Sequence, residues 1–123
     1  MSSLIGQVVV TPNVVASVIN ISDWSVSPVL KISGKFAQFV AIANMNTSYN
    51  TATITLKDSI KSLLDTTFIN NNGGYVLGNC TNYDTANSRS VHLSINTNGQ
   101  IQILSPSGNF YSYVAINVMI PLA

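Results

Sequence analysis

The sequence is poor in charged residues. Only 7% of its 123 residues are Asp, Glu, Lys or Arg, against roughly 25% in a typical globular domain. The acidic residues are four Asp and no Glu, and the basic ones are four Lys and one Arg, which gives a formal net charge of +1. Because there is no basic patch, binding of nucleic acid through counterion release is not expected.

Cysteine and long apolar runs are also scarce. Cys80 is the single cysteine, which excludes an intramolecular disulfide and a cysteine-based zinc site, and its expected role is that of a small buried hydrophobe. The segment Met1–Gln7 lacks the basic and apolar regions of a signal peptide. No apolar run approaches the roughly 20 residues of a membrane span, so membrane insertion is not expected.

The chain is rich in Asn, Ser and Thr instead, with fifteen Asn, and in alternating apolar and polar residues. Alternation with a period of two through Arg89–Ile95, Gln100–Leu104 and Tyr111–Pro121 predicts strands with one buried and one exposed face. Asn98-Gly99 can supply positive φ angles for a tight hairpin between the first two. The predicted exposed faces carry amides and hydroxyls, which can hydrogen-bond sugar hydroxyls but suit acid–base chemistry poorly.

The first two thirds of the chain continue this pattern. Strands are predicted over Val8–Val10, Val14–Ile19, Val29–Ser33, Phe36–Ala43 and Thr51–Leu56, and again from Tyr75. Between them, Asp23–Pro28 is expected to form a short edge or bend, and Cys80–Ser88 the longest polar loop.

One stretch departs from the alternation. Ile60, Leu63 and Leu64 are spaced as on one face of a helix, and Asp58 or Ser59 can cap its start. The stretch predicts at most one helical turn or an irregular segment. About nine strands with turn signals every 8–12 residues otherwise predict an all-β barrel or sandwich. A single domain over residues 1–123 is expected, with residues 1–22 as N-terminal strands or the remnant of a neck or linker.

The order of these features resembles the head domains of receptor-binding proteins from tailed phages of Gram-positive bacteria, in particular lactococcal baseplate proteins. The resemblance is one of layout over residues 24–122, through Trp24, Leu30–Phe36, Ile60–Phe68, Gly78–Ser88, Val91–Ile95, Gly99 and Tyr113–Leu122. Its most specific part is His92–Gly99. One lactococcal relative has His-x-Asp-x and a turn ending in Gly there, and its His and Asp contact saccharide. Ser94 stands in place of that Asp, and Ile103 in place of a Trp.

The resemblance implies an antiparallel Greek-key or jelly-roll-like β-barrel that forms a homotrimer on the virion tail or baseplate, outside the cell. It also implies that the head binds cell-wall or surface polysaccharide of the host during adsorption, and that it is joined to other tail proteins of the virion.

The predicted ligand site contains seven residues, which are Trp24, Asn82, Tyr83, Asp84, Arg89, His92 and Ser94. Asn82, Tyr83 and Asp84 belong to the predicted loop. This loop directly precedes the strand predicted to carry Arg89, His92 and Ser94, so it can fold over that strand's edge. His92 is interpreted either as a surface histidine bonded to an amide or as a ring that binds sugar hydroxyls. Arg89 can hold a phosphate of a phosphopolysaccharide in a bidentate way, or pair with Asp84.

The aromatic residues differ in their expected roles. Trp24 can stack on a pyranose ring or can fill the core or a subunit interface. Tyr83, between two polar residues of the predicted loop, is placed to be exposed. Tyr111 and Tyr113 are interpreted as packing residues.

Catalysis is not expected. The four Asp are scattered and form no evident pair of the kind a glycosidase needs, and no Gly-x-Ser-x-Gly motif is present. With one His and one Cys, neither a metal site nor a cofactor is predicted. The two main functional hypotheses are a saccharide-binding receptor-recognition head and a structural virion tail or appendage module that binds no ligand. A trimeric barrel of the tumour-necrosis-factor or complement-C1q type is a third.

Overall fold

Over the residues that the structure describes, the fold is mostly β with two short helices. The structure is a computed structural model that describes residues 8–74 and 76–123. The strands are β1 (Val8–Pro12), β2 (Val15–Ile19), β3 (Ile21–Ser33), β4 (Phe36–Met45), β5 (Thr51–Leu56), β6 (Leu77–Tyr83), β7 (Ser88–Ser90), β8 (His92–Ile95), β9 (Gln100–Leu104) and β10 (Tyr113–Pro121). The helices are α1 (Asp58–Lys61) and α2 (Thr66–Asn71).

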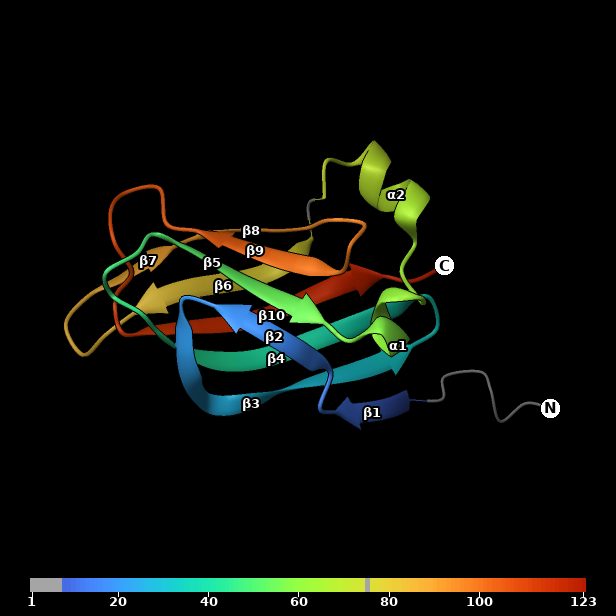
Figure 1. Cartoon of the computed structure of the whole chain (residues 1–123), viewed down its shortest axis with the longest axis horizontal. Helices are drawn as coiled ribbons and strands as arrows, with labels where there is room; N and C mark the ends of the chain where they lie inside the picture. Colours follow the sequence, from blue (N-terminus) through green and yellow to red (C-terminus); the bar gives the residue numbers. More distant parts are fainter. Residues whose placement is uncertain (1–7, 75) are drawn as a thin grey trace.

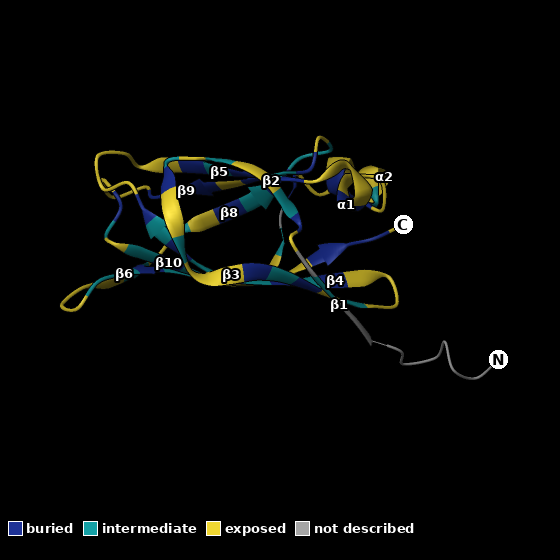
Figure 2. Ribbon diagram, turned by 60° about the horizontal axis from the view of Figure 1, so that its bottom comes forward, coloured by how far each residue is buried: buried dark blue, intermediate teal, exposed yellow. Residues whose placement is uncertain are grey.

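The strands form two antiparallel sheets (Figure 1). One sheet has the order β1-β3-β4-β10-β6-β7, and the other has the order β2-β5-β9-β8. Figure 2 shows the sheets as separate layers with both helices at one end. The β-rich, antiparallel prediction is therefore confirmed. The closed barrel is wrong for the described residues, because the two sheets face one another across the core without joining at their edges.

The core lies between the two sheets. Inward residues of the six-stranded sheet, such as Leu30, Phe39 and Ile116, are fully or almost fully buried, as are Ile54 and Ile101 of the four-stranded sheet. Burial of each such large side chain is worth about 1.5–3 kcal/mol relative to exposure. This core fixes which face of each strand points outward, and it therefore positions any surface site.

β3 is much longer than the sequence predicts. It runs through Asp23–Pro28, which was expected to be a short edge or bend, and register shifts follow Ile21, Trp24 and Val26. β1 pairs only with the second half of β3. The first half therefore has a neighbour on one side alone, where bulges and a proline are tolerated.

The predicted polar loop is shorter than expected. β6 extends through Cys80–Tyr83 and pairs with β10, so only Asp84–Asn87 remain outside the strands. Cys80 opposes Ile116 and packs against the core, and burial raises the pKa of its thiol to about 12. The predicted role of a small hydrophobe agrees with this environment, although Cys80 is only partly buried.

The helical stretch contains two helices instead of one turn. α1 begins after Lys57, which makes no side-chain cap, so neither predicted cap residue serves as one. α2 was missed in the sequence. Its cap is Asp65, whose carboxylate accepts a hydrogen bond from the backbone N–H of Phe68 at 3.0 Å.

The predicted hairpin between β8 and β9 is present, but Gly99 alone has a positive φ of 73°. The backbone N–H of Gly99 donates to the carbonyl of Asn96 at 3.1 Å. The side-chain oxygen of Asn96 accepts from the N–H groups of Asn98 and Gln100. An asparagine side chain therefore supports the turn.

Candidate functional site

The residues predicted to form one site lie on two different sheets. The predicted strand Arg89–Ile95 is broken at Val91, whose N–H donates to the carbonyl of Cys80. Arg89 lies on β7 in the six-stranded sheet, whereas His92 and Ser94 lie on β8 in the four-stranded sheet. The expectation that Arg89 and His92 share a strand is therefore wrong.

A shallow groove of about 400 Å³ crosses the outer face of the four-stranded sheet. It is lined by Thr51, Ala52, Thr53, His92, Ser94, Gln102, Ile103 and Leu104. Two cross-strand rows form it. One row is His92, Leu104 and Thr51, and the other is Ser94, Gln102 and Thr53. We call these eight residues the β8–β9–β5 groove.

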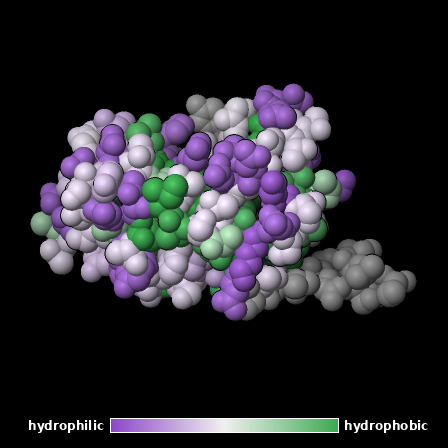
Figure 3. Space-filling model, viewed as in Figure 1, coloured by the Kyte–Doolittle hydropathy of each residue, from purple (hydrophilic) through white to green (hydrophobic). Residues whose placement is uncertain are grey.

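The groove offers hydrogen bonds without formal charge. Ser94, Gln102 and Thr53 place hydroxyl, amide and hydroxyl groups side by side on adjacent strands, and His92 is exposed at one end. Leu104, 40% exposed, adds a small apolar surface beside them. Figure 3, which has the viewpoint of Figure 1, shows that side of the molecule as mostly hydrophilic or neutral, with a compact hydrophobic patch left of centre and smaller hydrophobic areas elsewhere. Amides, hydroxyls and a small apolar surface suit an uncharged polyol better than an ion.

Sequence reasoning found His92 and Ser94 of this groove and missed Gln102, Thr53, Thr51 and Leu104. The signal for Gln102 was present, because it alternates with buried Ile101 and Ile103. What the sequence lacked was the pairing of β9 between β5 and β8, which joins segments about 50 residues apart in the chain.

Asn82 and Arg89 serve another purpose. The Asn82 side chain is 0% exposed, and its amide donates to the carbonyls of Tyr111 and Tyr113 at 3.1 and 2.8 Å. Its oxygen accepts from the N–H of Tyr111 at 2.9 Å and from Nε of Arg89 at 3.4 Å. Asn82 thus anchors the start of β10 to β6.

The Arg89 guanidinium holds the segment that leads into β10. It donates to the carbonyls of Gly108 and Asn109, and its central carbon lies 4.2 Å from the centroid of the Tyr111 ring. These contacts combine hydrogen bonds with a cation–π interaction. The guanidinium is directed at this loop, and its neighbours there are uncharged.

Tyr83 and Asp84 lie at the opposite side of the sandwich from the groove. Oδ1 of Asp84 accepts from the N–H groups of Ala86 and Asn87, both at 2.8 Å, and these bonds lower the pKa of the carboxyl. Asp84 therefore closes its own turn. The ring of Tyr83 lies beside that of Tyr113 on the six-stranded sheet, with centroids 5.3 Å apart. An open hollow of about 380 Å³ lies at this loop.

Trp24 lies apart from all of these. Its side chain is half-buried and packs against the core, next to a hollow of about 200 Å³ that Val14 and Pro28 also line.

Of the seven predicted residues, the structure thus brings together His92 with Ser94, Asn82 with Arg89, and Tyr83 with Asp84, in three separate places.

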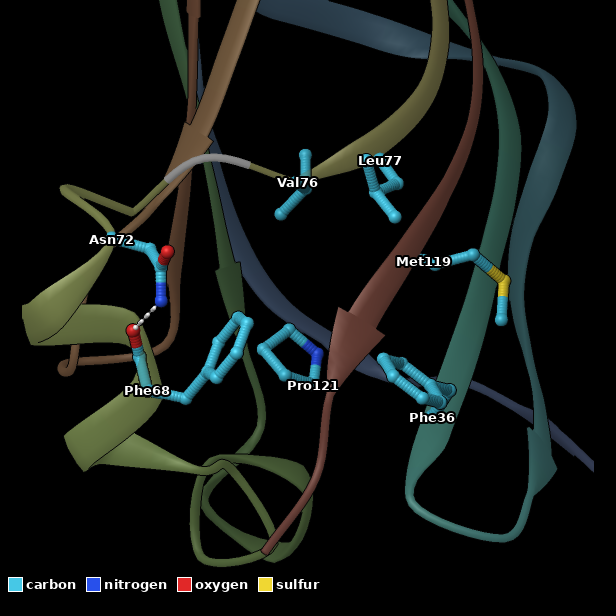
Figure 4. Close-up of a pocket in the computed structure, with 7 residues that line it drawn as sticks. All are labelled: Phe36, Phe68, Asn72, Val76, Leu77, Met119 and Pro121. Carbon is cyan, nitrogen blue, oxygen red and sulfur yellow. Dashed lines mark hydrogen bonds between the residues drawn. The ribbon is translucent and has the colours of Figure 1, made fainter.

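A second groove, of about 290 Å³, is apolar (Figure 4). It is lined by Phe36, Phe68, Asn72, Val76, Leu77, Met119 and Pro121. Figure 4 shows these side chains converging from α2, the start of β6, β10 and β4. The single polar side chain, Asn72, donates to the carbonyl of Phe68 at 2.9 Å. We call this site the apolar groove.

Within residues 8–74 and 76–123 no three His, Cys, Asp or Glu side chains gather in a way that could hold a metal ion. In the same part of the chain no helix is long and apolar enough to cross a membrane.

The fold and the groove together define a β-sandwich with an uncharged, hydrogen-bonding surface on one sheet. No family model matches this chain, and neither a curated protein nor a solved structure is significantly similar to it.

Proposed function

We propose that this protein is a saccharide-binding head that recognises host surface polysaccharide during phage adsorption. The observation that carries the proposal is the row Ser94, Gln102 and Thr53, which aligns three uncharged hydrogen-bonding side chains across β8, β9 and β5 beside His92. A neutral saccharide presents hydroxyls that such side chains can hydrogen-bond, and it carries no charge that this row would have to neutralise. The site is open and shallow, as recognition of a long polymer requires.

The proposal includes the setting implied by the resemblance to phage head domains. The protein is then part of the virion tail or baseplate, joined to other tail proteins, and present in several copies as a homo-oligomer. A Greek-key or jelly-roll-like connection of the strands belongs to the same proposal, and the mostly-β sandwich supports it.

Binding without catalysis fits the groove. The eight described residues that line it include no carboxylate, whereas glycoside hydrolysis commonly uses a pair of them across the scissile bond. One shallow sugar site is expected to bind with a Kd of about 1 mM, or about 4 kcal/mol. Several copies on one virion raise the overall affinity through avidity.

Substitution in the groove is the first test. We expect Gln102→Ala and His92→Ala each to reduce adsorption of fluorescently labelled protein to host cells at least about 10-fold, the equivalent of roughly 1.4 kcal/mol per site. Each substitution removes hydrogen-bonding groups from an outward-facing position, so the fold should be retained.

The matched control is Thr55→Ala, because Thr55 lies on β5 beyond the groove. Cells stripped of surface polysaccharide provide the second control and should bind none of the variants. If both groove variants, shown to be folded by circular dichroism, adsorb like wild type, the groove is not the saccharide site.

A structural role in the virion is the second candidate. It is favoured by exposed apolar side chains on the six-stranded sheet and around the apolar groove, including Phe36, Phe68 and Leu77. A purely structural module would assemble but would fail to adsorb to any polysaccharide-bearing cell.

A further inference from the structure

The outer face of the six-stranded sheet carries large apolar side chains among its polar ones, in a position where a solvent-facing sheet is normally polar. β4 shows this most clearly. Its outward residues include Phe36, Val40 and Ile42, whereas its inward residues include the smaller Ala37, Ala41 and Ala43. In Figure 2 neither helix covers this face. Large apolar side chains grouped on the outer face of a sheet are typical of a face that a partner covers.

Strand register arranges this face into four rows across β6, β10, β4 and β3. The rows are Leu77–Met119–Gln38–Lys31, then Asn79–Asn117–Val40–Val29, then Thr81–Ala115–Ile42–Val26, and last Tyr83–Tyr113–Asn44–Asp23. Side-chain hydrogen bonds join neighbours both between adjacent rows and within a row. Gln38 of the first row donates to Asn117 of the second at 2.7 Å, and Asn44 donates to Asp23 within the last row.

The rows match one another in reverse order. A rotation of 180° exchanges the first row with the last. Its axis lies in the plane of this face, runs across the strands and passes between the two middle rows. The rotation sets Lys31 opposite Asp23, and it sets the amide of Gln38 opposite that of Asn44. The same rotation brings Val40 opposite Ile42.

We propose that this outer face binds a second copy of the chain about that two-fold axis. Asp23 of each copy then meets Lys31 of the partner subunit, while the aliphatic centres of the two faces pack together. Charge complementarity singles out a second copy as the occupant. Asp23 and Lys31 lie near opposite ends of the same strand, β3, and have opposite charges, so two copies in reversed orientation pair them. Such an isologous contact is self-closing.

The apolar groove gains an occupant in this arrangement. The row that holds Tyr83 and Tyr113 faces the row that holds Leu77 and Met119, and the last two line the groove. The ring pair of one copy therefore packs over the groove of the other. Leu77, which is 76% exposed in the single chain, is covered. Sulfur–aromatic contact between Met119 and these rings is a favourable one.

The area of the face suits a stable dimer. β4 has ten residues, about 34 Å at about 3.4 Å per residue, and four strands about 4.8 Å apart are about 19 Å wide. The product, about 650 Å² before the groove and loops are added, is close to the roughly 800 Å² per partner of a standard interface. Two sheets packed in this way lie about 10 Å apart with strands aligned within about 30°.

The test uses charge exchange. We expect wild-type protein at micromolar concentration to have twice the chain mass of 13.1 kDa by light scattering and sedimentation. Asp23→Lys and Lys31→Asp should each weaken the dimer at least 10-fold, because each places like charges together twice. An equimolar mixture of the two variants should restore the dimer, since every cross-contact is then between a lysine and an aspartate.

Two controls separate this face from a general effect of charge. Lys57→Asp makes the same exchange outside the face, and Thr55→Lys adds a charge on the outer side of the other sheet. Both should leave the dimer intact, whereas Ile42→Lys at the centre of the face should give monomers with an unchanged circular dichroism spectrum.

Three results would overturn the inference. They are a wild-type mass of one chain, a mass of three chains such as the homotrimer expected from the sequence, and a mixture of the two charge variants that stays monomeric. Because the readout is mass alone, the result does not depend on whether the protein binds saccharide.

Discussion

Replacing Gly74 with alanine is expected to lower the free energy of unfolding by at least about 4 kcal/mol, a loss that only severe steric or burial defects produce. A Cβ atom on Gly74 would lie 2.2 Å from the carbonyl oxygen of Ile95, and the residue has a φ of +77°. The backbone cannot move away easily. Gly74 donates to the carbonyl of Ile69 in α2 and accepts from the N–H of Ile95 in β8 at 2.8 Å.

Gly34→Ala is the matched control. Gly34 also has a positive φ, +61°, but a Cβ there meets nothing within 4 Å. Its substitution should cost only the strain of the left-handed conformation, about 1–2 kcal/mol. Urea unfolding of both variants at one protein concentration provides the comparison, because self-association would add to the apparent stability. Equal losses in the two variants would show that α2 and β8 do not approach as the structure has them.

Asn82→Ala should lower the free energy of unfolding by about 3 kcal/mol. The substitution leaves the N–H of Tyr111 and the carbonyls of Tyr111 and Tyr113 without their side-chain partner in a buried place, and each unsatisfied group costs about 1–3 kcal/mol unless water reaches it. Arg89 loses one of its acceptors as well.

Asn70→Ala controls for the loss of an asparagine amide, since Asn70 is exposed on α2. It should change the stability by no more than about 0.5 kcal/mol. A loss for Asn82→Ala as small as that of the control would contradict the anchoring role of its amide.

Most strands could be predicted because alternation is a local property of the chain. β4, β5, β9 and β10 each bury every second residue, and a period of two identifies such strands without knowledge of their partners. The alternation failed where bulges shift the register, as in the first half of β3. α2 was missed because its capping residue, Asp65, lies only four residues after the end of α1, and α2 itself has one buried residue, Ile69.

The candidate site could be predicted only in part, for a related reason. The break at Val91 moves the chain from one sheet to the other, and nothing in the alternation of Arg89–Ile95 marks it. His92 and Ser94 were identified because both lie on the polar side of β8. Asn82 was taken for a ligand residue because a polar side chain in a polar segment looks exposed, whereas its burial depends on the return of β10 alongside β6.

The central claim is that the outer face of the four-stranded sheet binds saccharide, and a nuclear magnetic resonance titration tests it most directly. Uniformly ¹⁵N-labelled protein would be titrated with oligosaccharides released from the polysaccharide of cells to which it adsorbs. We expect the backbone amide shifts to concentrate at His92, Ser94, Gln102 and Thr53, with an apparent Kd of about 1 mM. Shifts confined to Tyr83–Ser88 on the other sheet, or no shifts up to several times that concentration, would contradict the account.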